Sequence, residues 1–69
     1  MRTLGENIKY FRIIQKISQK EFATKMQTSQ QRVSEWEFNK IEPSLYNVVK
    51  MLKIFEISFE ELIDGIEIT

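Results

Sequence analysis

The stretch TSQQRVSEWE, residues 28–37, decides how this chain is read, because it joins two kinds of residue. Hydroxyls, two glutamines and an arginine come first, and Val33 and Trp36 then follow at a spacing that puts both on one side of a helix. One hydroxyl is enough to cap a helix N-terminus. The glutamines are therefore either ordinary solvated surface or part of a binding site.

Composition excludes several classes of function. The 69 residues suffice for one domain, residues 1–69, and they include no cysteine and no histidine. Disulfides, thiolate metal sites, the commonest general base and the commonest zinc ligand are therefore missing, and no phosphate-cradling glycine loop is present. We predict a protein that is not an enzyme and uses no cofactor or metal. Without cysteine, a signal peptide or a membrane-spanning run, it is expected in the cytoplasm with no membrane partner.

Charge is unevenly distributed along the chain, although the formal net charge is zero. Residues 1–40 carry eight basic and four acidic residues, a balance of +4, and residues 41–69 carry two basic and six acidic residues, a balance of −4. Such asymmetry favours contact with nucleic acid through the basic half. It is a weak indication, because small proteins often have lopsided charge.

Apolar residues recur at helical spacing almost throughout, which predicts an all-α, compact five-helix bundle. The expected helices are 4–14, 19–26, 30–38, 45–53 and 59–63. Capping boxes, a hydroxyl with a glutamate three residues later, mark three starts at Thr3, Ser18 and Ser58, and Ser29 and Ser44 are further caps. The side chains expected in the core are Leu4, Ile8, Phe11, Phe22, Ala23, Met26, Val33, Trp36, Leu45, Val48, Val49, Leu52, Ile54, Phe55, Ile57, Phe59, Leu62 and Ile63.

The tail, residues 65–69, alternates apolar and polar residues. It can pair as a strand with another chain, but a frayed end is the simpler expectation.

Helices 19–26 and 30–38, joined by a short turn, have the layout of a helix-turn-helix. Spacing alone does not separate this motif from any short helical hairpin. The pieces LGENIKYFR, ISQKEFATKM, TSQQRVSEWE, NK followed by Pro43-Ser44-Leu45, and ISFEELI agree in order and spacing with a known family. The chain resembles, over residues 4–63, the Cro/C1-type (XRE-like) helix-turn-helix family, which includes the lambda repressor.

The resemblance implies that helix 30–38 reads double-stranded DNA in the major groove. Gln30 and Gln31 would read bases, since a glutamine amide can pair bidentately with adenine, and Arg32 could reach a guanine or a phosphate. Ser34 and Glu35 fall at further reading positions, where Glu35 could accept from a cytosine amine. The residues implied to hold phosphates are Gln19, Ser29, Asn39 and Lys40. Arg12 and Glu37 match a structural pair that ties the first helix to the third.

Several residues depart from the family pattern. Lys16, Gln27, Asn39 and Glu56 stand where turn glycines are usual, and of these only asparagine readily accepts a left-handed backbone. The turns are therefore expected to be strained or reshaped. Ile13, Ile14 and Phe38 replace usually polar residues, so at least one should be exposed, and all three together would suggest a protein interface.

Two functions from different classes follow. The first is a sequence-specific DNA-binding transcriptional regulator, a repressor. It would act as a homodimer, joined through its last helices and tail, on half-sites roughly 34 Å apart. The second is a protein-interaction module, such as an antitoxin or adaptor, with the same fold. RNA binding lacks an aromatic stacking platform.

Overall fold

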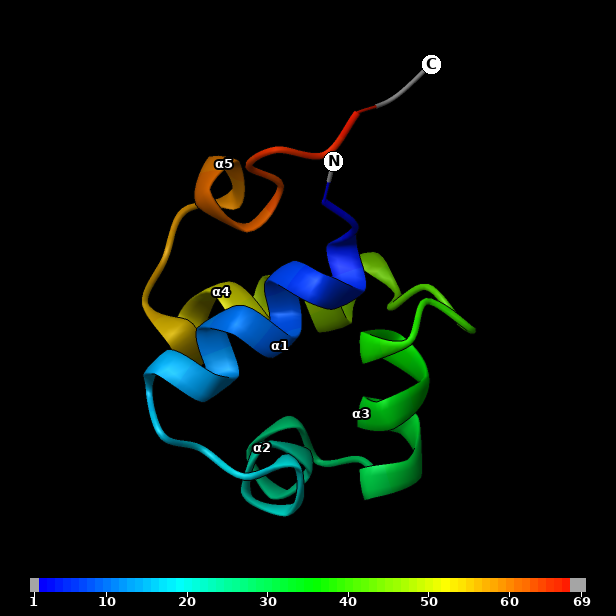
Figure 1. Cartoon of the computed structure of the whole chain (residues 1–69). Coiled ribbons are helices and arrows are strands. Elements are labelled where there is room, and N and C mark those ends of the chain that lie inside the picture. Colours follow the sequence, from blue (N-terminus) through cyan, green and yellow to red (C-terminus); the bar gives the residue numbers. More distant parts are fainter. Residues whose placement is uncertain (1, 68–69) are drawn as a thin grey trace.

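The computed structural model describes residues 2–67, and within that range it has five α-helices and no β-sheet (Figure 1). The helices are α1 (Leu4–Ile14), α2 (Gln19–Met26), α3 (Gln30–Glu37), α4 (Leu45–Phe55) and α5 (Phe59–Leu62). The predicted all-α five-helix class is confirmed. Helices α3 and α5 each end one residue earlier than predicted and α4 ends two residues later, within the usual uncertainty of helix ends.

A hydroxyl residue caps the start of every helix in this range. Thr3, Ser18 and Ser58 each form the predicted capping box, in which the hydroxyl accepts from a backbone N–H and a glutamate returns a hydrogen bond. Ser29 and Ser44 accept from the N–H groups of Arg32 and Asn47. These local bonds set the helix starts because they satisfy backbone donors that have no partner inside the helix.

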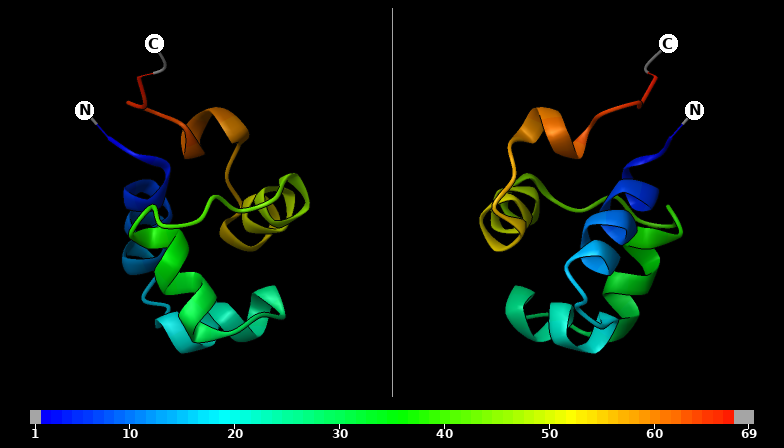
Figure 2. Two further views of the ribbon diagram at one scale, coloured as in Figure 1. Left: turned by 90° about the vertical axis from the view of Figure 1, so that its right-hand side faces the viewer. Right: turned by 60° about the vertical axis from the view of Figure 1, so that its left-hand side comes forward.

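Helix α1 lies between α5 and α2 in the view of Figure 1, and the turned views show it at one side of the molecule (Figure 2). It packs against α3 and α5, and α2 packs against α3 and α4. The side views show α2 and α3 together at one end and α5 with both chain termini at the other (Figure 2). The helix-turn-helix pair therefore stands at the end opposite α5.

The core lies between all five helices. Its buried apolar residues are Ile8, Phe22, Ala23, Met26, Val33, Trp36, Val48, Met51, Phe55 and Leu62. Phe22 of α2 stacks on Phe55 of α4 with ring centroids 4.8 Å apart, which joins the helix-turn-helix to the second half of the chain. Met51 is also fully buried, although it was not among the residues predicted for the core.

Three predicted core residues are instead exposed. Leu45 is 75 %, Val49 43 % and Phe59 51 % accessible to solvent. Helix α4 has apolar residues on more than one side, and it turns Val48, Met51 and Phe55 inward. Leu45 and Val49 consequently lie together on its outer surface, four residues apart.

The four residues at the expected glycine positions all adopt the left-handed conformation. Lys16, Gln27, Asn39 and Glu56 have φ of 58°, 59°, 59° and 57°. Each follows a helix, and the N–H of the next residue returns to a carbonyl of the last turn, as in a Schellman motif. The turns therefore keep the shape that glycine would give, and the expectation of reshaped turns is wrong.

The chain ends meet near α5. The Arg2 N–H donates to the Gly65 carbonyl at 3.1 Å, and Arg2 and Ile66 form an isolated parallel bridge. The first part of the predicted tail is thus paired with Arg2 of the same chain, and residues 68 and 69 lie outside the described residues. The Asn7 amide donates to the carbonyls of Leu62 and Asp64 at 2.7 and 2.9 Å, which fixes α5 on α1.

Ile13, Ile14 and Phe38 are all exposed, so the prediction that at least one is on the surface is confirmed. They come from different parts of the fold. Asn39, which follows Phe38, accepts a hydrogen bond from the N–H of Gly5 at the start of α1, whereas Ile13 and Ile14 are at the other end of that helix. Among residues 2–67, no helix is long and apolar enough to cross a membrane.

Candidate nucleic-acid interface

Helix α3 divides into a buried and a solvent-facing side. Val33, Trp36 and Glu37 point into the molecule, and Gln30 and Gln31 are exposed at its first turn. Ser34 and Glu35 follow one turn later and are partly exposed. The outward side is therefore a row of short and medium polar side chains that reaches from the N-terminus of the helix toward its end.

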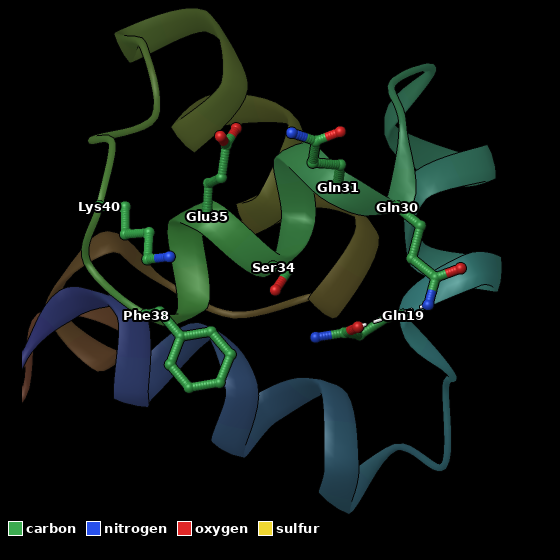
Figure 3. Close-up of a pocket in the computed structure, with 7 residues that line it drawn as sticks. All are labelled: Gln19, Gln30, Gln31, Ser34, Glu35, Phe38 and Lys40. Atoms are coloured by element: carbon green, nitrogen blue, oxygen red, sulfur yellow. Dashed lines mark hydrogen bonds between the residues drawn. The ribbon is translucent and has the colours of Figure 1, made fainter.

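This row forms part of a shallow depression of about 470 Å³ (Figure 3). One residue of α2, four of α3 and two from the turn after α3 surround it: Gln19, Gln30, Gln31, Ser34, Glu35, Phe38 and Lys40. Gln19 and Gln30 stand at one end, Phe38 and Lys40 stand at the other, and Ser34 lies between them. The structure thus brings together six of the residues that the sequence predicted for DNA contact.

A chain of polar contacts runs from the core to this surface. The Arg12 Nε donates to Glu37 Oε2 at 2.6 Å and its Nη2 to Oε1 at 3.1 Å, which makes a buried bidentate ion pair between α1 and α3. Gln19 Nε2 donates to the same Glu37 Oε1 at 3.0 Å. Gln30 Nε2 lies 3.5 Å from Gln19 Oε1, a long and weak contact. The ion pair therefore orients Gln19, and Gln19 lies beside Gln30.

Arg32 stands apart from this depression. Its Nε lies 3.4 Å from Glu35 Oε1 one turn later, and half of its side chain is exposed. The pair bridges the outer edge of α3, so a base or phosphate would have to compete with Glu35 for the guanidinium. An exposed pair of this kind contributes little to stability and can open readily.

Asn39 has a structural task that the sequence did not indicate. Its Oδ1 accepts from the Gly5 N–H at 3.0 Å, and its amide nitrogen donates to the Thr3 hydroxyl at 2.8 Å. These bonds tie the first turn of α1 to the end of α3 and leave one amide N–H for a phosphate. Lys40 follows in the same turn, where its N–H donates to the Glu35 carbonyl and its side chain borders the depression.

Phe38 is the residue of this surface that was not predicted to contact DNA. It is 67 % exposed and borders the depression next to Lys40. Its only signal in the sequence was an aromatic residue at a usually polar position.

Two helix N-termini also flank the surface. Ser29 uses its hydroxyl oxygen to cap α3, and Gln19 is the first residue of α2. The first N–H groups of a helix have no partner inside it, and the helix dipole makes this end favourable for anions. Polar side chains of both donor and acceptor type, two helix N-termini and one free lysine are a combination suited to nucleic acid.

Fold and surface together define a helix-turn-helix domain of the DNA-binding class. A helix-turn-helix family model matches residues 8–62, most of the chain, and the chain belongs to this Cro/C1-type family of DNA-binding transcription regulators. No curated protein matches the chain. The resemblance inferred from the sequence is therefore confirmed, and the roles of individual residues remain predictions.

Proposed function

We propose that the protein is a sequence-specific double-stranded DNA-binding regulator of transcription, a repressor, that reads the major groove with α3. The observation that carries the proposal is the outward row of Gln30, Gln31, Ser34 and Glu35, presented beside two helix N-termini. A groove-binding helix needs such a row, because base edges present hydrogen-bond donors and acceptors. Occupancy of an operator excludes other proteins from it, which is the simplest route to repression.

The base contacts are assigned to the exposed amides. Gln30 and Gln31 can each donate to N7 and accept from N6 of an adenine, and a good pair of this kind discriminates by about 1–3 kcal/mol. Ser34 can donate or accept, and Glu35 accepts from a cytosine amine when it is released from Arg32. Gln19, Ser29 and Lys40, with the remaining N–H of Asn39, hold phosphates and fix the position of α3 without reading sequence.

We further propose that the protein binds as a homodimer through α4. Leu45 and Tyr46 are 75 % and 87 % exposed, and Val49 follows on the same side of the helix. These adjacent apolar side chains support a protein contact, since burying them in a second copy would remove them from water. The tail that was expected to contribute is paired with the chain's own N-terminus up to Ile66.

The direct test is selection of bound duplexes from a random double-stranded pool, followed by sequencing. Enrichment of a two-fold symmetric motif is expected, and Gln31→Ala should relax preference at one position of each half-site and weaken binding by about 1–3 kcal/mol. Lys53→Ala, an exposed charge in the last turn of α4 and outside the depression, is the control and should change neither. If the folded protein enriches no motif, sequence-specific binding is ruled out.

The same apolar side of α4 favours the second function, a protein-interaction module. The double variant Gln30→Ala with Gln31→Ala separates the two, because it should weaken DNA binding and leave binding to a protein partner unchanged. A Tyr46→Lys variant should abolish binding to a protein partner. Analytical ultracentrifugation would show whether it also converts a dimer to a monomer, in which case DNA binding should weaken because only one half-site is held. A protein partner lost on changing the glutamines would assign α3 to protein contact instead.

A further inference from the structure

One residue of the surface has no role in the functions described so far. Phe38 caps the C-terminal end of α3, and the residue is two-thirds exposed among polar neighbours. Ser34 and Glu35, four and three residues earlier, place it on the outward side of the helix, and it borders the same depression as Gln31. Within residues 2–67 no other ring packs against it.

The chemistry of the major groove narrows what such a ring can contact. Donors and acceptors line the base edges, and the 5-methyl group of thymine is their apolar feature. A phenylalanine cannot donate to or accept from the polar edges, but it can exclude water from that methyl group. Lys40 lines the same end of the depression as the ring (Figure 3), so its ammonium group could hold a phosphate while the ring contacts a base.

We propose that Phe38 is a specificity-determining residue that selects thymine through its 5-methyl group. The inference rests on the proposed function, since it requires α3 in the major groove. Phe38 follows Gln31 by seven residues, or about 10 Å along a helix at roughly 1.5 Å per residue. With base pairs about 3.4 Å apart, the selected thymine lies about three base pairs from the base that Gln31 reads, where α3 follows the groove.

The surroundings of Phe38 favour DNA over a protein partner. An apolar patch for protein contact would continue onto neighbouring apolar side chains, as on α4, but the residues around this depression other than Phe38 are polar or charged. Ile13 and Ile14 are exposed at the end of α1, and they do not line this depression. The ring is therefore a single apolar point in a polar row.

The test replaces each thymine of the selected motif in turn by deoxyuracil, which removes only the methyl group. Wild-type protein should lose about fourfold in affinity at one thymine of each half-site, the value for one buried methyl-sized group. Phe38→Ala should bind the unmodified duplex more weakly and show no further loss at that position. Thymines near the glutamine contacts should affect both proteins equally, and thermal unfolding checks that the variant folds.

The outcomes separate the two proposals. If a motif is enriched and Gln31→Ala weakens binding, but Phe38→Ala keeps the wild-type response to deoxyuracil at every position, the role of Phe38 is overturned and the proposed function stands. Phe38→Ala binding as tightly as wild type overturns it as well. If no motif is enriched, the proposed function fails and the thymine contact fails with it.

Discussion

At the scale of single residues, the four turn positions with a left-handed backbone carry strain that glycine would not have. Asparagine tolerates positive φ, but lysine, glutamine and glutamate do so at a cost of about 1 kcal/mol or more. All four nevertheless adopt φ near 58° (57–59°), because the hydrogen bonds that close each helix demand it. The tertiary fold thus maintains the strain, and substitution by glycine should remove it.

Lys16→Gly and Glu56→Gly should therefore each raise the free energy of unfolding by about 0.5–1 kcal/mol, as relieved strain exceeds the extra flexibility of glycine in the unfolded chain. Both side chains are exposed and make no hydrogen bond within the described part of the chain. Asn39→Gly is the matched control, because it also deletes the bonds to Gly5 and Thr3 and should not stabilise. Urea titration measures all three, and destabilisation by both of the first two would refute the argument.

Asn39 and Gln19 were predicted as DNA contacts, but their hydrogen bonds within the protein were not. Asn39 bonds to residues more than thirty positions away, and Gln19 meets Glu37 eighteen positions along the chain. Such partners are fixed by packing and leave no periodic trace in one sequence. The exposed glutamines were predictable because their position depends only on the phase of α3, which Val33 and Trp36 set.

At the scale of elements, helix starts were predictable because capping is local: a hydroxyl and a glutamate three residues apart are enough. The choice of which α4 side chains are buried was not predictable. The apolar residues of this helix cover adjacent stripes, and packing against the rest of the core, including Phe22 of α2, decides that Val48 and Met51 turn inward and Leu45 stays outside. Hydrophobic periodicity reports that a helix has an apolar side, but a broad apolar side leaves its orientation open.

Packing of α1 on α3 depends on Gly5. A Cβ there would lie 2.5 Å from the Glu37 carbonyl oxygen and closer still to that of Trp36. Gly5→Ala should lower the free energy of unfolding by about 1–3 kcal/mol, the usual cost of overpacking, although alanine favours helices intrinsically. Thermal unfolding measures the effect, with Lys9→Ala on the same helix as control. An unchanged melting temperature would mean that the two helices separate without cost.

The start of α2 should respond to acid. The backbone N–H of Ser18, and then its hydroxyl, hold the pKa of Glu21 below its ordinary value. A lowered pKa means that the charged carboxylate favours the folded state: this stabilisation is complete above the ordinary pKa of about 4.3 and is lost as pH falls through the lowered value. Glu21→Gln should therefore destabilise at pH 7 and lose less stability than wild type on acidification. Unfolding followed by circular dichroism at several pH values measures this difference. An equal loss of stability in both proteins would exclude the capping carboxylate as the cause.

At the scale of the whole molecule, zero net charge conceals a separation that suits DNA binding at one end. The acidic second half supplies α5, which the side views place opposite the α2–α3 end (Figure 2). Near the proposed interface, Arg32 and Lys40 are the cations assigned to DNA, and Arg32 is partly neutralised by Glu35. Affinity should therefore depend more on hydrogen bonds and less on counterion release than in a strongly basic repressor.

The salt dependence of operator binding tests this balance. Release of counterions gives a slope of log K against log salt of about −0.9 for each neutralised phosphate. With two cations per protomer, a dimer should show a slope of roughly −3.6, and Lys40→Gln should reduce its magnitude by about 1.8. Lys53→Gln, remote from the depression, should leave it unchanged. A wild-type slope near −10, or a slope that Lys40→Gln does not change, would show that lysines outside this surface, such as Lys20 or Lys25, contact the duplex. The interface would then be wider than α3.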